Sequence, residues 1–276
     1  MPEGPEVARM IYEVHQHFIG KTCIRVEIRG GKYTRHGVPR GFNDFQNALP
    51  LTLKQAETHG KFAWLSWTKN WDTWVQFGMT GYFCSSEFLP ASIPHIRREE
   101  EARKCDKHGH IWFHFRDSEP LVFADQRNFG NLSWTNNPKE TQDYVDKLGP
   151  DPLREELTKK WWDSAADRLD KKPKKMIAEI LLDQTFVAGI GNYLRSEILW
   201  KAGIHPEREW GNISKKERTK LWELLEEVPR EKSEEEERTG DLTFWVYQEK
   251  KDPNGNPVIP VKIKGRTVWI APEVQK

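Results

Sequence analysis

The chain has 276 residues, of which 37% are hydrophobic and 31% charged, and its formal net charge at pH 7 is +1. This composition is typical of one large or two ordinary globular domains and excludes a disordered chain. No apolar run is long enough to span a bilayer, and we expect no secretory signal. Because the total charge is nearly neutral, a nucleic-acid surface would need a local cluster of Lys and Arg.

Three cysteines, Cys23, Cys84 and Cys105, are widely spaced and form no Cys-x-x-Cys pair. An odd number at such spacings argues against a disulfide framework. We therefore expect free cysteines and an intracellular, reducing setting, with the compartment within the cell left open.

A helix is predicted first, over residues 5–18. Pro5 and Glu6 suit its first turn and Gly20 suits its end. Its apolar residues recur every three or four positions, which gives one buried stripe. They are Val7, Met10, Ile11, Val14 and Phe18.

From residue 22 to about residue 134 the pattern changes to short runs of alternating, β-branched and aromatic residues separated by Gly, Asn and Asp. Such a pattern predicts an all-β half, either a sandwich or a barrel. The predicted strands include 22–28, 62–67, 73–77, 110–115 and 121–123.

Breaker residues over 136–152 mark a domain boundary, and helical periodicity returns after Leu153. Apolar groups over 178–182 and 194–199 predict two helices, and 215–228 predicts a third. The charge run 231–238 is interpreted as a solvated loop. The last 30 residues return to strand-like alternation around Gly265.

The N-terminal Pro2 carries a distinct chemical possibility. Removal of Met1 would leave a secondary amine, and an α-amino group has a pKa of about 7.7–8.0, so much of it is unprotonated near neutral pH. Such an amine can attack an aldehyde-like sugar carbon and form an iminium. The adjacent Glu3 could move protons. Many chains begin Met-Pro, and taken alone the commoner explanation is a terminal proline that precedes a helix.

The longer string Pro2-Glu3-Gly4-Pro5-Glu6-Val7 resembles the opening of the formamidopyrimidine-DNA glycosylase and endonuclease VIII (Fpg/Nei) family. The resemblance implies that Pro2 is the nucleophile and Glu3 a proton donor and acceptor, with Glu6 near the DNA. Gly4 is more similar to the endonuclease VIII branch than to bacterial Fpg.

Three further segments of the first half resemble family motifs. By the match, Lys61 after Gly60 is the β-turn lysine that contacts DNA near the lesion, and Met79 fills the hole left by an extruded base. In 125–130, Arg127 would face the orphaned base and Phe129 would wedge into the stack. This loop departs from the family pattern at Gln126 and Asn128, which puts its stiffness in doubt. Without the resemblance, an exposed turn cation and a core methionine are the commoner explanations.

The second half continues the resemblance. Residues 148–153 match the interdomain stretch, and 182–192 match the helix–two-turns–helix, in which Gly191 and Asn192 would bind a phosphate. The basic run 171–175 suits backbone phosphates, although a solvated loop explains it equally well. Residues 261–270 read as two strands about a Gly turn. They resemble the zincless finger of animal, plant and giant-virus members, with Lys264 and Arg266 on the DNA.

Residues 245–276 contain neither Cys nor His, which excludes a zinc site there. A competing zinc site is conceivable at Cys105, His108, His110 and His114. We favour the histidines facing a neighbouring strand or solvent, because His110 and His114 share the parity of an alternating strand. We expect no cofactor and no metal.

The sequence therefore predicts an α+β protein of two domains. A helix and β-sandwich occupy 1–138, a linker 139–152, and a helical domain 153–276, with the zincless-finger hairpin from about 245. The resemblance implies a bifunctional DNA glycosylase and AP lyase for oxidised pyrimidines and ring-opened purines. It would be a monomer that binds damaged duplex DNA and also single strands, away from any membrane. Two alternatives remain: a lesion-binding protein without chemistry, and a small-molecule tautomerase with an N-terminal proline.

Overall fold

The computed structural model describes residues 2–86, 105 and 107–276, so the expected removal of Met1 lies outside the described residues. The chain divides into two compact units. Unit 1 contains Pro2 and Glu6–Lys147, and unit 2 contains Glu3–Pro5 and Leu148–Lys276. Among the described residues, no helix combines the length and apolarity that crossing a bilayer requires.

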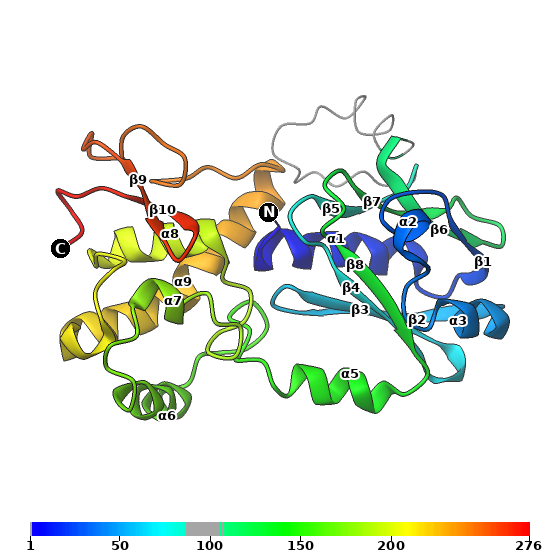
Figure 1. Ribbon diagram of the computed structural model, residues 1–276, viewed down its shortest axis with the longest axis horizontal. Helices are drawn as coiled ribbons and strands as arrows, with labels where there is room; N and C mark the ends of the chain where they lie inside the picture. Colours follow the sequence, from blue (N-terminus) through cyan, green and yellow to red (C-terminus); the bar gives the residue numbers. More distant parts are fainter. Residues whose placement is uncertain (1, 87–104, 106) are drawn as a thin grey trace. The chain divides into compact units, whose positions relative to one another are not determined.

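Unit 1 is built from strands and a few short helices around one long helix, α1 (Figure 1). The helices are α1 (Gly4–Phe18), α2 (Tyr33–His36), α3 (Phe42–Ala48), η1 (Thr68–Asn70) and α5 (Pro138–Val145). The strands are β1 (Thr22–Ile28), β2 (Leu51–His59), β3 (Phe62–Trp67), β4 (Trp71–Gln76), β5 (Gly81–Cys84), β6 (Gly109–Phe115), β7 (Leu121–Asp125) and β8 (Asn131–Thr135).

These strands of the described chain form an antiparallel array in the order β5-β7-β6-β1-β2-β3-β4-β8. Its two four-stranded halves are joined only by the short β1–β2 pairing, Thr22 with Thr52 and Cys23 with Leu51. Inward-facing residues of both halves belong to one apolar cluster, as expected when two sheets pack face to face. The predicted β-sandwich is confirmed.

Helix α1 confirms the predicted amphipathic stripe. Its five stripe residues are each at most 2% exposed and belong to the same apolar cluster as the sheets. Burial of such a stripe supplies most of the stability of a helix this short, because isolated helices are marginal in water. The helix therefore fixes the start of the chain against the sandwich.

Unit 2 is mainly helical and ends in a hairpin (Figure 1). Its elements are α6 (Lys159–Asp170), α7 (Ile177–Ile180), α8 (Asn192–Ala202), η2 (Trp210–Asn212), α9 (Lys215–Thr239), β9 (Ile259–Ile263) and β10 (Arg266–Ile270). The hairpin buries Ile263, Val268 and Ile270 against the helical core, each at most 4% exposed. The two strands that the sequence predicts about Gly265 are confirmed.

The interpretation of 231–238 as a loop is wrong, because α9 continues to Thr239 through Pro229. Two charged residues of that run, Lys232 and Glu236, are buried. Lys232 is 1% exposed and donates to Glu235 at 2.9 Å and to the carbonyl oxygen of Thr243 at 2.6 Å. Because such partners can offset the desolvation of a charge, a charge run need not be a solvated loop.

The expectation of free cysteines is wrong for one pair, since Cys84 and Cys105 form a disulfide with a Cα–Cα distance of 6.4 Å. Cys84 ends β5, and the fold brings Cys105 to it across 21 positions of sequence. Cys23 remains a free, buried thiol, and burial raises its pKa to about 12.

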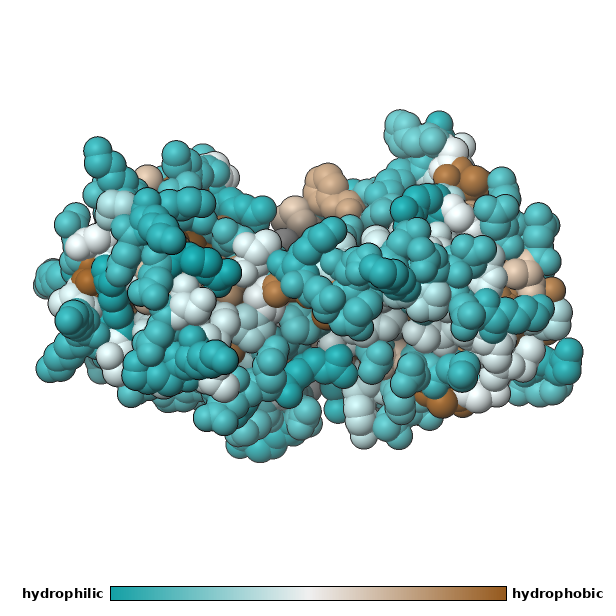
Figure 2. All heavy atoms as spheres, turned by 90° about the horizontal axis from the view of Figure 1, so that it is seen from below, coloured by the Kyte–Doolittle hydropathy of each residue, from teal (hydrophilic) through white to brown (hydrophobic). Residues whose placement is uncertain are grey.

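The face of the molecule shown in Figure 2 is mostly hydrophilic, and its hydrophobic residues appear as separate spots. Scattered apolar residues are normal on a protein surface. Two exposed apolar side chains nevertheless stand out by their place in the fold. Phe129 is 62% exposed and Met79 is 39% exposed, both in loops at one end of the unit 1 sheet.

Candidate active site

The carboxylate of Glu3 is buried and caps the N-terminus of helix α8 in unit 2. Its oxygens accept hydrogen bonds from the backbone N–H groups of Gly191, Tyr193 and Leu194 at 2.7, 2.9 and 3.1 Å. The first N–H groups of a helix have no partner within it, and a negative charge there is favourable. Glu3, which is 1% exposed, is thus held by charge-assisted hydrogen bonds one residue from Pro2.

Gly191 is required for this contact. A Cβ atom at that position would lie 2.3 Å from the Cδ atom of Glu3. The N-terminal segment is also fixed one residue on, where the N–H of Gly4 donates to the carbonyl oxygen of Gly189 at 2.9 Å. The glycines therefore let the start of the chain approach the turn before α8, where the sequence predicted close approach of a phosphate.

Asn192, the first residue of α8, lies in a hydrogen-bonded chain that reaches the hairpin. Its Nδ2 donates to the carbonyl oxygen of Thr267 at 2.7 Å, and its Oδ1 accepts from Arg195 Nη2 at 2.5 Å. Thr267 follows Arg266 on β10. The hairpin tip carries Lys264 and Arg266, both exposed, and the chain turns there through left-handed φ angles of +48° at Lys264 and +79° at Gly265.

Arg195 is a buried cation behind these contacts. It is 1% exposed and also donates to the carbonyl oxygen of Ala178 at 3.1 Å. Burial lowers the pKa of its guanidinium to about 10, while the nearby Glu3 raises it and Arg266 lowers it further. The guanidinium stays protonated near neutral pH, so it adds positive charge close to Gly191 and Asn192, the two residues that the sequence predicts to bind a phosphate.

Three loops of unit 1 lie at the same end of its sheet. The register pairs His59 with Phe62, Phe62 with Gln76, and Gln76 with Asn131. The β2–β3 turn, the loop after β4 and the loop before β8 must therefore be neighbours. They carry Lys61, Met79, Arg127 and Phe129, four of the residues for which the resemblance implies contact with DNA.

Asp125 holds two of these loops together. Its carboxylate, 1% exposed, accepts from the hydroxyl of Thr80 at 2.6 Å and from the backbone N–H groups of Arg127 and Gly130 at 3.1 and 2.6 Å. Arg127 also donates to the sulfur of Met79 at 3.8 Å. Exposed Phe129 is thus carried by a braced loop, which is what an apolar wedge needs.

Asn128, where the family pattern has arginine, braces the same loop. Its φ is +58°, a left-handed conformation that asparagine tolerates better than most residues. Its Oδ1 accepts from the backbone N–H of Lys32 at 3.1 Å. The departure at Asn128 therefore gives the loop an additional attachment.

The predicted residues fall into two sets, one in each unit. Unit 2 brings together Glu3, Gly191 and Asn192, with Lys264 and Arg266 on the neighbouring hairpin. Unit 1 holds Lys61, Met79, Arg127 and Phe129 at one end of its sheet. Partly exposed Pro2 also belongs to unit 1, as does Glu6, 5% exposed in the first turn of α1.

Sequence reasoning missed Asp125, Thr80 and Arg195. The first two could have been suspected, because an aspartate that opens a loop commonly binds backbone N–H groups a few residues on. Arg195 gave no such signal, since a basic residue within a predicted helix is usually solvated.

The candidate zinc cluster has other partners. Cys105 is in the disulfide, His110 contacts the carbonyl oxygen of Asp125 at 2.7 Å, and His114 contacts Glu27 at 2.9 Å. The predicted orientation of the two histidines toward neighbouring strands is confirmed. Within 2–86, 105 and 107–276, no group of three or more His, Cys, Asp or Glu side chains could hold a metal ion.

Comparison with known proteins gives matches along most of the chain. Residues 1–132 match the family model "Formamidopyrimidine-DNA glycosylase N-terminal domain", and residues 148–240 match "Formamidopyrimidine-DNA glycosylase H2TH domain". A formamidopyrimidine-DNA glycosylase of Streptococcus pneumoniae serotype 4 is 30% identical over 80% of this chain and 73% of its own length. One from Listeria innocua is 29% identical over the full length of both, and one from Arabidopsis thaliana 28% identical over all of this chain and 71% of its own.

Solved structures give the same fold. A Lactococcus lactis Fpg, bound non-covalently to DNA containing an AP site, has a TM-score of 0.81 and 23% identity and covers 99% of both chains. A MutM in complex with DNA containing carbocyclic 8-oxo-G has a TM-score of 0.80 and 23% identity over the full length of both. At this identity the likeness establishes the architecture, in agreement with the predicted fold class.

Proposed function

The chain belongs to the formamidopyrimidine-DNA glycosylase family, and on this premise we propose that it is a bifunctional DNA glycosylase and AP lyase of base excision repair. Pro2 is its nucleophile and Glu3 assists proton transfer. The enzyme acts as a monomer inside the cell on damaged DNA, in duplex and in single strands. Oxidised pyrimidines and ring-opened purines are its substrates.

The observation that carries the proposal is the burial of Glu3 against the α8 amides. A carboxylate with three N–H donors cannot swing away, so it stays beside the nucleophile next to it in the chain. Asn192 begins the helix that this carboxylate caps and is hydrogen-bonded to the hairpin that carries Lys264 and Arg266, and these side chains supply donors for phosphate. Unit 2 thus supplies a proton-transferring group and anion contacts, and the proposed nucleophile precedes that group directly in the chain.

The proposed reaction uses Pro2 and Glu3. The Pro2 nitrogen bonds to sugar C1′ as the bond from C1′ to the base breaks, and the base leaves with the electron pair and a proton. Opening of the C1′–O4′ bond, with a proton delivered to O4′, gives the iminium. Loss of a C2′ proton expels the 3′ phosphate, and loss of a C4′ proton then expels the 5′ phosphate. Water finally hydrolyses the iminium and frees the enzyme.

Met79, Arg127 and Phe129 occupy the gap left by the extruded nucleotide. Phe129 is the apolar wedge, and the Arg127 guanidinium supplies hydrogen-bond donors to the orphaned base. Lys61, on the turn beside these loops, contacts the DNA near the lesion.

The lesion preference is supported by helix α9. The interval 228–243 is too short for the long loop that caps 8-oxoguanine in bacterial Fpg, and most of it is helical here, since α9 ends at Thr239. The few residues left before the next packed side chains are too short to cover a base. Together with Gly4, this favours oxidised pyrimidines and ring-opened purines over 8-oxoguanine.

Borohydride trapping on duplex oligonucleotides, each with one lesion, tests the proposal. We expect a covalent adduct with wild-type protein and none with Pro2→Gly, and more adduct with thymine glycol or a ring-opened purine than with 8-oxoguanine. Glu3→Gln should bind the same DNA and trap poorly. Equal trapping by Pro2→Gly, or binding without any adduct, would leave a lesion-binding protein and defeat the proposed chemistry.

A further inference from the structure

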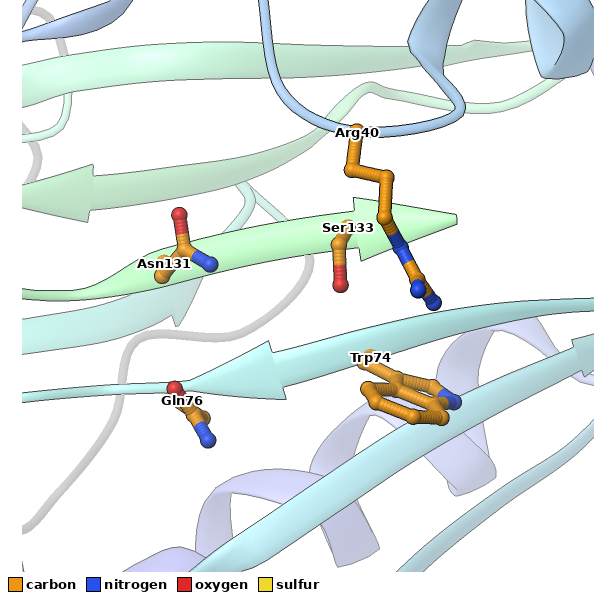
Figure 3. Close-up of a pocket in the computed structure, with 5 residues that line it drawn as sticks. All are labelled: Arg40, Trp74, Gln76, Asn131 and Ser133. Atoms are coloured by element: carbon orange, nitrogen blue, oxygen red, sulfur yellow. The ribbon is translucent and has the colours of Figure 1, made fainter. Parts of the chain in front are cut away.

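A small pocket of about 290 Å³ lies on the outer face of β4 and β8 in unit 1, away from the residues of the proposed reaction (Figure 3). Arg40 extends towards the indole of Trp74, and three polar side chains line the two strands beside them (Figure 3). These polar residues are Gln76, Asn131 and Ser133.

Trp74 is a partly exposed ring that its neighbours hold in place. Its Nε1 donates to the hydroxyl of Thr141 at 2.8 Å. Its ring packs against Phe62 and Tyr144, with centroid separations of 5.5 and 5.4 Å. The Arg40 guanidinium lies 5.2 Å from the indole centroid and is paired with Glu140 at 3.0 Å. A fixed, accessible indole is a ready surface for stacking a planar group.

Three polar side chains beside the indole are available to bind a ligand. Gln76 and Asn131 are register partners on β4 and β8, as are Trp74 and Ser133, so all four side chains share one face of the sheet. Within the described residues, the side chains of Gln76, Asn131 and Ser133 make no hydrogen bond to other protein groups. Each amide offers both donors and an acceptor to a ligand.

The pocket also continues directly from the loops of the candidate DNA interface. Gln76 precedes the loop that carries Met79, and Asn131 follows the loop that carries Phe129. Trp74 lies two residues back along β4, a distance of about 7 Å at ~3.3 Å per residue. A strand that leaves the gap between these loops therefore meets the amides first and the indole next.

Given the proposed function, on which this inference rests, we propose that the pocket binds a nucleobase of an unpaired DNA segment adjoining the lesion. The base stacks on Trp74, its edge bonds the amides of Gln76 and Asn131, and Arg40 contacts the flanking phosphate. Stacking on aromatic side chains beside a cation is the general means by which proteins hold single strands without reading sequence. The site gives this protein an affinity for bubbles and single-stranded flanks that blunt duplex DNA does not use.

Fluorescence anisotropy with three probes tests the site: a lesion-free oligothymidylate, a tetrahydrofuran-spacer oligomer of equal length without bases, and a blunt duplex with one tetrahydrofuran. We expect Trp74→Ala to weaken oligothymidylate binding by about 5- to 150-fold, since stacking is worth ~1–3 kcal/mol per base. Binding of the other two probes should change less than twofold. Trp74→Phe should restore most of the affinity, and Gln76→Ala with Asn131→Ala should lose about threefold or more.

Trp64→Ala is the matched control, because Trp64 is the register partner of Trp74 on β3 and does not line the pocket. It should leave all three affinities unchanged. Unchanged oligothymidylate binding by Trp74→Ala overturns the proposal, as does an equal loss for all three probes. Borohydride trapping of lesion duplex by the same variant is measured in parallel, so loss of the pocket and failure of the proposed chemistry give different results.

Discussion

Arg195 fixes the side-chain amide of Asn192 by donating from Nη2 to Oδ1 at 2.5 Å, while the same amide donates to the carbonyl oxygen of Thr267 at 2.7 Å. An amide nitrogen has two N–H donors, so one N–H of Asn192 is left for an external acceptor. We therefore regard Arg195 as a positioning residue for the proposed phosphate contact of Asn192.

Replacement of Arg195 by methionine tests this relationship. The loss of a charged donor should weaken binding of lesion duplex about tenfold, because hydrogen bonds to charged groups are worth ~1.5–3 kcal/mol. The trapping rate at saturating DNA should remain. In an Asn192→Ala background the same change should cost less than twofold, as expected when two residues act through one contact. Equal losses in both backgrounds would assign Arg195 a merely structural role.

Gly191→Ala should displace Glu3, because the added Cβ would meet its Cδ at 2.3 Å. We expect a loss of ~1–3 kcal/mol in the free energy of unfolding, typical of overpacking, and loss of borohydride trapping. Urea denaturation and trapping measure the two effects. In a Glu3→Ala background the alanine at 191 should add little further loss of stability. A full additional loss there would show that the clash lies elsewhere.

Asp125→Asn should loosen the loops that carry Met79 and Phe129, because it places an amide N–H group against N–H donors. We expect ~1–3 kcal/mol lower stability from the unsatisfied donors and weaker insertion beside the lesion. Fluorescence of 2-aminopurine next to a tetrahydrofuran site reports insertion, and its rise on binding should shrink. Asp72→Asn is the control, since Asp72 is equally buried and accepts from Ser66 and Thr141 instead. A comparable fluorescence change in that control would contradict the assignment.

Glu217 predicts an acid-sensitive contribution to stability. Its ion pair with Arg208, together with the Ser214 cap of α9, lowers its pKa from 4.5 to about 2. A carboxylate with a lowered folded-state pKa stabilises the protein above about pH 4.5, and this stabilisation is lost as the pH falls towards 2. Because the side chain is partly exposed, we expect about 1 kcal/mol.

Thermal unfolding of Glu217→Gln against wild type should therefore show a lower Tm at pH 7 and a vanishing difference near pH 2. Asp143→Asn, which removes the exposed Lys139–Asp143 pair, should show almost no difference at either pH. A Tm difference for Glu217→Gln that persists at pH 2 would rule out the ionic explanation.

The sequence predicted most elements because their periodicity reflects burial directly. The stripe of α1 and the runs of β1 and β3 are the clearest cases, and β3 begins and ends where the alternation does. The 231–238 segment failed for the opposite reason. Whether Lys232 is solvated depends on acceptors such as the Thr243 carbonyl, and the positions of such acceptors emerge only in the tertiary fold.

The sequence predicts those residues of the site that lie in contiguous motifs. Pro2, Glu3 and the loop residues Arg127 and Phe129 lie in recognisable strings. The residues that hold them do not, because Asp125 acts through the distant Thr80 and Glu3 through amides 188 or more positions away. The Cys84–Cys105 bond is another such case, since spacing alone does not show which thiols approach one another.

Because Glu3 caps α8, the protein cannot be cut into two independent fragments at the boundary near residue 148. The chain passes from unit 2 to unit 1 after Pro5 and returns after Lys147. A fragment of residues 148–276 alone would leave the opening amides of α8 without their acceptor. The helical half is thus not a portable module: to be transplanted intact into another protein, it must take the first few residues of the chain with it.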